Sequence, residues 1–312
     1  GSRAYVYEYQ GSKGFRLTNA DLGAQRNNKK RCEDEGRSAF AVDEMIFKCR
    51  DKNIEYGNEP LIMGIINVTP DSFSDGGDYA ESDNAINHAK ELIADGADIL
   101  DFGAQSTRPG HTPVSADEEI KRLSAVIPAV RSFTDKPISV DTYYPEVAKK
   151  VIEWGADIIN DVSGVINPDM ASLIKKSGAG WIIMHSTAGS ITEVSEFFAS
   201  SIYECEAYGI DKEQICLDMG IGFGKTRQQD LELIAGVKQY KVCGYPLLLG
   251  TSSKRVIGEY SGQSEPKERI YGNIAADTAA ILGGVDIIRL HDVKHEKQGI
   301  KMAYALKKAL GE

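Results

Sequence analysis

Residues 61–77 read LIMGIINVTPDSFSDGG, and their character changes at Asn67. The residues before Asn67 are apolar, which is typical of a strand buried on both faces, as in a parallel sheet. The residues after it are polar, and Pro70, Gly76 and Gly77 break regular structure. This stretch therefore predicts a buried strand that ends abruptly in a polar loop.

The same pattern recurs in further segments of the chain. They are DILDFGA (98–104), PISVDT (137–142), DIINDV (157–162), GWIIMH (180–185), ICLDMG (215–220), PLLLGTS (246–252) and DIIRLH (286–291). Helical patterns fill the intervals, near 81–96, 115–133, 144–155, 169–177, 191–209, 229–242, 266–283 and 294–310. Strands and helices that alternate eight times over about 250 residues predict a closed (β/α)8 TIM barrel in the α/β class, with a doubly wound open sheet as the alternative.

The chain before the barrel divides into two parts. Residues 1–44 show little apolar periodicity and are interpreted as an N-terminal extension, either a flexible tail or a segment with a lid or contact role. Residues 46–60, IFKCRDKNIEYGNEP, alternate roughly between apolar and polar and predict a short hairpin. The main domain is expected to cover residues 45–312.

Composition narrows the classes of function. The chain is 42% hydrophobic and 26% charged, which is ordinary for a globular protein, and no apolar run is long enough to predict a membrane span. The net charge of −10 argues against general nucleic-acid binding. The cysteines are odd in number and form no CxxC pair, which indicates reduced thiols and a cytoplasmic protein.

A barrel of this kind predicts where catalytic groups lie, because they are found at the C-terminal ends of its strands. A buried polar group without a partner costs about 1–3 kcal/mol, so polar residues at nearly every strand end are better explained by a shared cavity than by separate structural roles. Taken singly, Asp101 or His185 is equally well explained as a structural hydrogen-bonding group. The polar residues at the predicted strand ends are Asn67, Asp101, Asp141, Asn160, Asp161, His185, Asp218, Ser252, Lys254, Arg289 and His291.

One part of this set suits a polar heterocycle. Asp141, Asn160, Asp218 and Lys254 together present hydrogen-bond donors and acceptors. Their combination matches a ring that carries amide and amino edges. The predicted ligand of this part is therefore a polar heterocycle.

The other part suits phosphate. Arg108, Arg289 and His291 offer cationic or donor groups for an anion. Asn67 offers a neutral oxygen that can hold a hard ion such as Mg²⁺ beside phosphate oxygens. The sequence therefore predicts a phosphate subsite next to the heterocycle.

The segment GIGFGKT (220–226) resembles a nucleotide phosphate loop but does not match it. Met219 stands where that motif requires its first glycine, and the segment follows the sixth predicted strand rather than the first strand of a nucleotide-binding sheet. No nucleoside triphosphate site is expected here.

Several motifs in order resemble those of the dihydropteroate synthase family. They are MGIINVTPDSFSDGG (63–77), STRPG (106–110), ISVDT (138–142), IINDVSG (158–164), GIGFGK (220–225) and IIRLHDV (287–293), and the resemblance runs from about residue 45 to the end. It implies a transferase of folate biosynthesis that joins 6-hydroxymethyl-7,8-dihydropterin diphosphate to 4-aminobenzoate, releasing diphosphate by dissociative C–O cleavage. It also implies a Mg²⁺ cofactor, a homodimer formed through late barrel helices, and sensitivity to sulfonamides.

The resemblance implies a role for each matching residue. The diphosphate group is Asn67, Arg108, Arg289 and His291, with Asn67 as the Mg²⁺ ligand. The pterin group is Asp141, Asn160, Asp218, Lys254, Met184 and Phe223. The 4-aminobenzoate group is Thr107, Pro109, Ser252 and Phe73. Asp141, Lys254 and Arg108 are expected to act in catalysis, with Asp141 stabilising the cation that forms on the pterin CH₂.

The stretch after Asn67 then has an expected purpose. It resembles the first active-site loop, which would close over bound diphosphate and form the 4-aminobenzoate pocket together with STRPG, so that pterin binds first. Three positions depart from the family pattern without removing an expected site residue: Gln105 stands where an acid is common, Met219 where proline is typical, and Ser253 where arginine is usual.

Two other functions remain as alternatives. A pterin-dependent methyltransferase would share the heterocycle site but would need no diphosphate clamp, so Arg108, Arg289 and STRPG argue against it. A non-catalytic pterin-binding homologue would keep the pterin residues without turnover.

Overall fold

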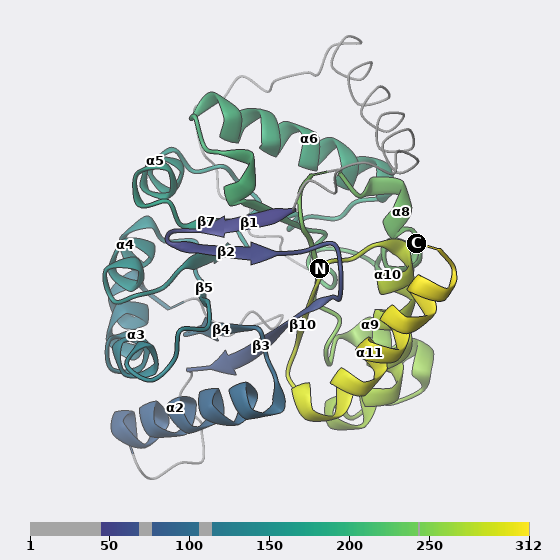
Figure 1. Cartoon of the computed structure of the whole chain (residues 1–312), viewed down its shortest axis with the longest axis horizontal. Coiled ribbons are helices and arrows are strands. Elements are labelled where there is room, and N and C mark those ends of the chain that lie inside the picture. Colours follow the sequence, from purple (N-terminus) through teal and green to yellow (C-terminus); the bar gives the residue numbers. More distant parts are fainter. Residues whose placement is uncertain (1–44, 69–76, 106–113, 243, 312) are drawn as a thin grey trace, which may run out of the picture. The chain divides into compact units, whose positions relative to one another are not determined.

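A closed barrel of parallel strands forms the centre of this protein (Figure 1). The computed structural model describes residues 45–68, 77–105, 114–242 and 244–311. The chain divides into two units, Gly1–Ala41 and Val42–Glu312, and the barrel belongs to the second. The predicted extension of residues 1–44 lies outside the described residues, so its boundary with the main domain stays a prediction.

The strands follow one another around the barrel in chain order, and β10 closes the ring against β3. Every neighbouring pair is parallel. Each predicted strand segment contains one observed strand, which confirms the (β/α)8 prediction over the open sheet. The strands are β3 (Leu61–Asn67), β4 (Ile99–Gly103), β5 (Ile138–Asp141), β6 (Ile158–Asp161), β7 (Gly180–Met184), β8 (Ile215–Asp218), β9 (Leu247–Leu249) and β10 (Ile287–Leu290).

Helices surround the barrel and begin and end largely where caps and glycines predicted. Ser115 accepts a hydrogen bond from the Glu118 amide at the start of α3, and Gly96 takes a φ of +99° after α2. The helix predicted over 229–242 is divided at Gly236, and the short helix α9 was not predicted. The helices are α2 (Gly77–Asp95), α3 (Ala116–Arg131), α4 (Pro145–Glu153), α5 (Pro168–Ser177), α6 (Ile191–Ala207), α7 (Arg227–Ala235), α8 (Val237–Tyr240), α9 (Arg255–Ser261), α10 (Ile270–Gly283) and α11 (Val293–Ala309), with 3₁₀ turns η1 (Lys212–Gln214) and η2 (Pro266–Arg269).

The predicted N-terminal hairpin is present and closes one end of the barrel. Strands β1 (Ile46–Cys49) and β2 (Lys52–Glu55) pair antiparallel and lie across the barrel strands in Figure 1. Phe47, Cys49, Ile54 and Tyr56 pack against apolar residues from the N-terminal ends of the strands. We call this packed set the plug layer: Phe47, Cys49, Ile54, Tyr56, Met63, Ile99, Ile158, Ile182, Cys216, Leu248 and Ile287.

The intervening strand residues point outward and form the main core with the helices. Phe102 and Trp181 are fully buried members of this core. Cys49, Cys205 and Cys216 are free, buried thiols. In the part of the chain that the structure describes, no helix is both long and apolar enough to span a membrane.

Candidate active site

The interior of the barrel becomes polar just above the plug layer. Alternate residues of a strand point to the same face, so the residue two positions after a plug-layer residue also points into the barrel. These second inward residues include Asp101, Asn160, Asp218 and Arg289, and Asp141 follows the inward Ser139 of β5 in the same way. Strand alternation thus brings five predicted polar groups from separate strands into one layer.

Arg289 lies at the centre of this layer and binds two carboxylates. Its Nε and Nη2 atoms are 2.7 and 2.6 Å from Oδ2 of Asp101. Its Nη2 atom also lies 3.5 Å from Oδ2 of Asp141. The amide nitrogen of Asn160 donates to the same Asp101 oxygen at 3.4 Å. One guanidinium therefore connects groups from β4, β5 and β10.

Three polar atoms beside this centre are buried without a hydrogen-bond partner. They are Oδ1 of Asp101, Oγ of Ser139 and Oδ1 of Asn160, on the adjacent strands β4, β5 and β6. Each such atom costs about 1–3 kcal/mol when nothing satisfies it. Their grouping on one side of Arg289 is the arrangement expected where a polar ligand binds.

Burial and the neighbouring charges shift the pKa of Asp141. Burial raises the pKa of Asp141 to about 7, Arg289 and Lys254 oppose the rise, and Asp101 and Glu119 add to it. Burial opposes the charge on Arg289, but Asp101 and Asp141 more than offset this, so the pKa of Arg289 is raised. The guanidinium is permanently charged, whereas the Asp141 carboxyl titrates near neutral pH.

After strands β8 and β9, the layer combines a lysine, an aromatic ring and a carboxylate. The ammonium of Lys254 lies 4.4 Å from the centroid of the Phe223 ring. Burial lowers the pKa of Lys254 to about 8. Asp218 accepts a hydrogen bond from the Gly220 amide at 2.8 Å, and Met184 pairs with Asp218 in register and is buried. These residues form a wall with an apolar face and polar edges, an arrangement that suits a heterocycle.

Ser252 and His291 are joined at the rim of the barrel. The Ser252 hydroxyl lies 2.9 Å from Nδ1 of His291 and accepts the His291 backbone amide at 3.2 Å. Asn67 ends β3 beside Gly103 and is exposed. Its neutral side-chain oxygen at an open rim fits an ion that keeps most of its ligands from substrate phosphate and water, as Mg²⁺ does.

Four predicted site residues cannot be compared with the structure. Phe73, Thr107, Arg108 and Pro109 lie outside the described residues. Their proposed roles therefore stay predictions.

The residues on either side of segment 106–113, which contains STRPG and which we call the second loop, are nevertheless held in place. Gln105 accepts the Val114 amide at 3.2 Å, and Arg122 donates to the Ala104 carbonyl at 2.8 Å. The Tyr144 hydroxyl donates to the Val114 carbonyl at 3.1 Å. The departure at Gln105 thus supplies a neutral hydrogen-bond acceptor that joins the two ends of this loop.

The other two departures also have structural accounts. Met219 is fully buried, and its sulfur accepts from the Tyr240 hydroxyl at 2.9 Å, so it fills the space beneath α7 and α8. Ser253 takes a φ of +61°, an uncommon conformation for a non-glycine residue, and its carbonyl accepts from Arg269 at 2.7 Å. Both residues lie beside the site without removing a group from it.

Two polar residues at strand ends do not join the inward layer. The His185 ring packs edge-on against Phe197 of α6 at 5.1 Å, and burial lowers its pKa to about 4. Asp161 follows the inward Asn160 and accepts the Ser163 amide at 2.9 Å. His185 therefore lies outside the inward layer, and its buried Nδ1 atom has no hydrogen-bond partner among the described residues, so the choice between a structural and a functional role stays open.

Some buried ionisable groups close to the site were given no functional role in the sequence analysis. Asp101 had no assigned role, although its place at a strand end marked it. Glu119 accepts from the Thr142 hydroxyl at 2.8 Å, and burial raises its pKa to about 7. Asp277 accepts from the Thr251 hydroxyl at 2.6 Å. Glu119 stands four residues before the buried Leu123 of α3, and Asp277 four residues before the buried Ile281 of α10, so their place on the apolar helix face was the signal that could have found them.

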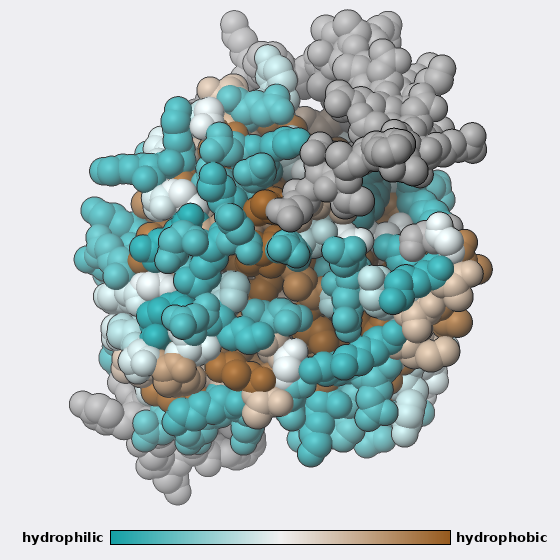
Figure 2. Space-filling model, viewed as in Figure 1, coloured by the Kyte–Doolittle hydropathy of each residue, from teal (hydrophilic) through white to brown (hydrophobic). Residues whose placement is uncertain are grey.

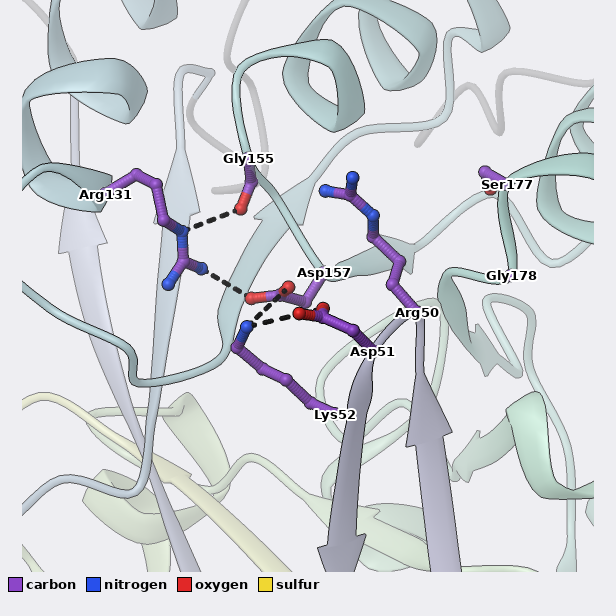
Figure 3. A pocket seen from close by; sticks show the side chains of 8 residues that line it. All are labelled: Arg50, Asp51, Lys52, Arg131, Gly155, Asp157, Ser177 and Gly178. Atoms are coloured by element: carbon purple, nitrogen blue, oxygen red, sulfur yellow. Dashed lines mark hydrogen bonds and ion pairs between the residues drawn. The ribbon is translucent and has the colours of Figure 1, made fainter.

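A pocket of about 530 Å³ lies at the opposite, N-terminal end of the barrel (Figure 3). Its basic residues bind protein groups. Arg131 lies 2.5 Å from Asp157 and donates to the Gly155 carbonyl, and Lys52 lies 3.4 Å from Asp157. Arg50 donates to two carbonyls at and just beyond the end of α4. These cations stabilise the hairpin and helix ends. Since they have structural partners, we assign no ligand to this pocket. The candidate site therefore remains at the C-terminal end of the barrel.

Comparison with known proteins identifies the family. Residues 63–291 match the family described as pterin binding enzyme. A dihydropteroate synthase of Synechocystis is 42% identical over 265 residues, which cover 81% of this chain and 92% of that protein.

Solved structures give the same result. A dihydropteroate synthase from Clostridium difficile, determined in the presence of pteroic acid, is 45% identical with a TM-score of 0.77 over 81% of this chain and 98% of its own. The enzyme from Xanthomonas albilineans with 4-aminobenzoic acid is 35% identical with a TM-score of 0.80 over 85% of this chain and 98% of its own.

Proposed function

This chain belongs to the dihydropteroate synthase family, and we propose that it performs the family's transfer reaction at the C-terminal end of its barrel. The enzyme is a transferase that joins 6-hydroxymethyl-7,8-dihydropterin diphosphate to 4-aminobenzoate and gives 7,8-dihydropteroate and diphosphate. The observation that carries the placement is the Arg289 guanidinium between Asp101 and Asp141, with unpartnered polar atoms beside it.

The pterin ring binds in the inward polar layer. Asn160 and Asp218 hydrogen-bond its amide and amino edges, and Asp141 and Lys254 complete the polar rim. Phe223 and Met184 provide the apolar wall. This assignment is supported by the burial of Asn160, Asp218 and Met184 and by the orphaned Asn160 oxygen, which a donor on the ring would satisfy.

The C–O bond to diphosphate breaks before the new C–N bond is complete. The electron pair leaves with diphosphate, and the electron-rich pterin carries the positive charge on its CH₂ group. The ionised Asp141 carboxylate stabilises that charge. The neutral amine of 4-aminobenzoate then attacks the CH₂ and afterwards loses a proton, so no covalent nucleophile from the protein is required.

Diphosphate is held at the rim by Arg108, Arg289 and His291. Arg289 reaches this group from the pterin layer, where Asp101 fixes its guanidinium. Asn67 would hold Mg²⁺ together with diphosphate oxygens. When bound, Mg²⁺ neutralises the charge on the leaving group.

4-Aminobenzoate binds between the two long loops. Ser252, Phe73, Thr107 and Pro109 surround it, and Ser252 is already fixed by His291. Sulfonamides compete in the same pocket. Because this pocket is completed by the first loop, pterin diphosphate binds before 4-aminobenzoate.

The late helices offer a surface for a homodimer. Tyr271 of α10 is 83% exposed, and Met302 and Leu310 at the end of the chain are 58% and 67% exposed. Figure 2 shows hydrophobic side chains gathered near α11 at the right of the view. An apolar surface of this kind suits association with a second copy. Light scattering of wild type and Met302→Glu tests this, because a monomeric wild type would exclude it.

The direct test of the function is diphosphate release. Wild-type protein is incubated with the pterin diphosphate and Mg²⁺, with and without 4-aminobenzoate, and both diphosphate and dihydropteroate are measured. We expect release of diphosphate in step with formation of dihydropteroate. Tight pterin binding without any release would instead support a non-catalytic pterin protein.

The site assignment is tested separately. Asp141→Asn keeps the shape of the side chain but removes its charge, so turnover should fall by about 100-fold or more. Pterin binding, followed by calorimetry, should change much less. Unchanged turnover would remove Asp141 from the proposed mechanism.

A further inference from the structure

Lys225 has no role in the mechanism described above, although it belongs to the segment that resembles a phosphate loop. It follows β8 at the end of GIGFGK and is only 6% exposed. A buried ammonium is costly unless it is fully hydrogen-bonded. Its contacts therefore show what the segment does.

The Lys225 ammonium binds backbone carbonyls. It donates to the carbonyls of His185 at 2.9 Å, Gly220 at 2.9 Å and Phe223 at 3.3 Å. An ammonium has three N–H donors, so these bonds use all of them. The lysine is thus turned toward the protein, where a phosphate-loop lysine would face its ligand.

The contacts join two loops at the mouth of the barrel. The His185 carbonyl follows β7, and the other two carbonyls belong to the loop after β8. Gly220 and Gly222 in that loop take φ values of +65° and +82°, which are favourable only for glycine. A Cβ atom on Gly220 would come within 2.0 Å of the His185 carbonyl oxygen, so the loop lies tightly against the end of β7.

The same loop carries groups of the proposed pterin wall. The Gly220 amide donates to Asp218 at 2.8 Å and so orients that carboxylate. The Phe223 ring lies beneath the Lys254 ammonium, and the Phe223 carbonyl is a ligand of Lys225. The position of Lys225 is therefore coupled to both the polar edge and the apolar face of the subsite.

We propose that Lys225 is a positioning residue for the pterin subsite, which it builds by tying the loop of residues 219–224 to the end of β7. This inference rests on the proposed function, because it takes the ligand of Asp218 and Phe223 to be the pterin ring. Without the ammonium, three converging carbonyls would lose their donor, and the loop would move to reach water. Asp218 and Phe223 would then no longer meet the ring together.

The diphosphate end of the site is built differently. Arg289 is fixed by Asp101, and His291 is fixed by Ser252, and neither contact involves the loop after β8. A change at Lys225 should therefore weaken pterin recognition far more than diphosphate recognition. A general loss of folding would weaken both.

The test is Lys225→Met, which keeps the length of the side chain and removes its donors. We expect the KM for the pterin diphosphate to rise about tenfold or more. The Kd of inorganic diphosphate with Mg²⁺, measured by calorimetry, should stay within about twofold. Lys225→Arg retains donors and should recover part of the loss.

Lys241→Met is the matched control. Lys241 is also partly buried and binds the Gly284 carbonyl and Asp286, which lie just before β10 at the N-terminal end of the barrel. Its replacement removes a comparable lysine contact far from the pterin wall. We expect the pterin KM of this variant to stay close to the wild-type value.

Two results would overturn the proposal. One is an unchanged pterin KM in Lys225→Met, and the other is an equal loss of pterin and diphosphate binding. If Lys225→Met does not fold, Lys225→Gln is measured in the same way and judged by the same criteria.

Wild-type turnover separates this inference from the function on which it rests. Wild type that fails to bind or turn over the pterin diphosphate would refute the proposed function. Active wild type with an insensitive Lys225→Met would refute only the positioning role.

Discussion

Glu296→Gln should make this protein more resistant to alkaline unfolding. Glu296 lies in the first turn of α11 and is 1% exposed. Burial raises its pKa to about 8, with Asp277 and Asp292 adding to the rise and Asn273 opposing it. The carboxyl is therefore protonated in the folded protein at neutral pH, where the glutamine amide resembles it in shape and charge.

The sign of the effect follows from proton binding. Above about pH 4.5 the unfolded chain has lost this proton, whereas the folded protein keeps it until about pH 8. Stability from Glu296 is thus fully present below about pH 4.5 and is lost as the pH rises through about 8. The slope is about 1.4 kcal/mol per pH unit within this window, so about 2–3 kcal/mol is lost between pH 6 and pH 8.

Glutamine carries no proton to lose, so this part of the pH dependence should disappear. Oδ1 of Asn273 is buried without a partner, and the glutamine amide can donate to it. The advantage of the variant over wild type should therefore grow by about 2–3 kcal/mol between pH 6 and pH 8.

Urea unfolding followed by tryptophan fluorescence provides the measurement, because Trp181 is fully buried in the core. Glu206→Gln, at an exposed position on α6, is the control for removing one negative charge. Equal pH dependence in wild type and Glu296→Gln would show that Glu296 is ionised in the folded protein. Destabilisation of the variant at every pH would show that the carboxylate itself is required.

Three further outcomes follow from the site. The kcat/KM for the pterin diphosphate should rise with pH near 7 as Asp141 loses its proton and fall near 8 as Lys254 does, and a profile that stays flat in this range would contradict both assignments. Arg289→Met leaves Asp101 and Asp141 buried without their cation and should cost about 3–5 kcal/mol in urea unfolding together with nearly all turnover, whereas wild-type stability would mean that the pair is solvated. Gly220→Ala should lose on the order of 3 kcal/mol, because a side chain at that φ meets the backbone of β7, and a smaller loss in thermal unfolding would mean that the loop moves freely.

The barrel could be predicted because its strands are buried on both faces and repeat with regular spacing. Each apolar run marks a strand, and each glycine or cap marks a helix end. The exact ends of the helices could not be predicted where tertiary contacts determine them. Gly236 divides one predicted helix, and α9 (Arg255–Ser261) is too short for helical periodicity to reveal.

The inward direction of the strand-end residues could be predicted, because alternation leaves little freedom there. Once Ile158 faces the plug layer, Asn160 must also face inward and Asp161 must face outward. The groups behind the site were not accessible in this way. Glu119 is an acid on the apolar face of α3, and its acceptance of a hydrogen bond from Thr142, which follows β5, could not be read from the helical pattern. Lys225 lay within a recognised motif, but the direction of its side chain depends on carbonyls that only the folded loop brings together.

The reaction forms a cation and an anion, and the charges of the site match where the cation forms. Asp101, Asp141 and Asp218 lie in the inward layer with Arg289 and Lys254, so that the layer carries one more negative than positive charge when its carboxyls are ionised. The proposed mechanism places the pterin CH₂ against this layer and the diphosphate at the rim. A cation forming near the layer would then be stabilised by carboxylates already in place. The largely buried position of Asp141, whose side chain is 12% exposed, is essential to this arrangement, because the same burial that raises its pKa also strengthens its interaction with the forming cation.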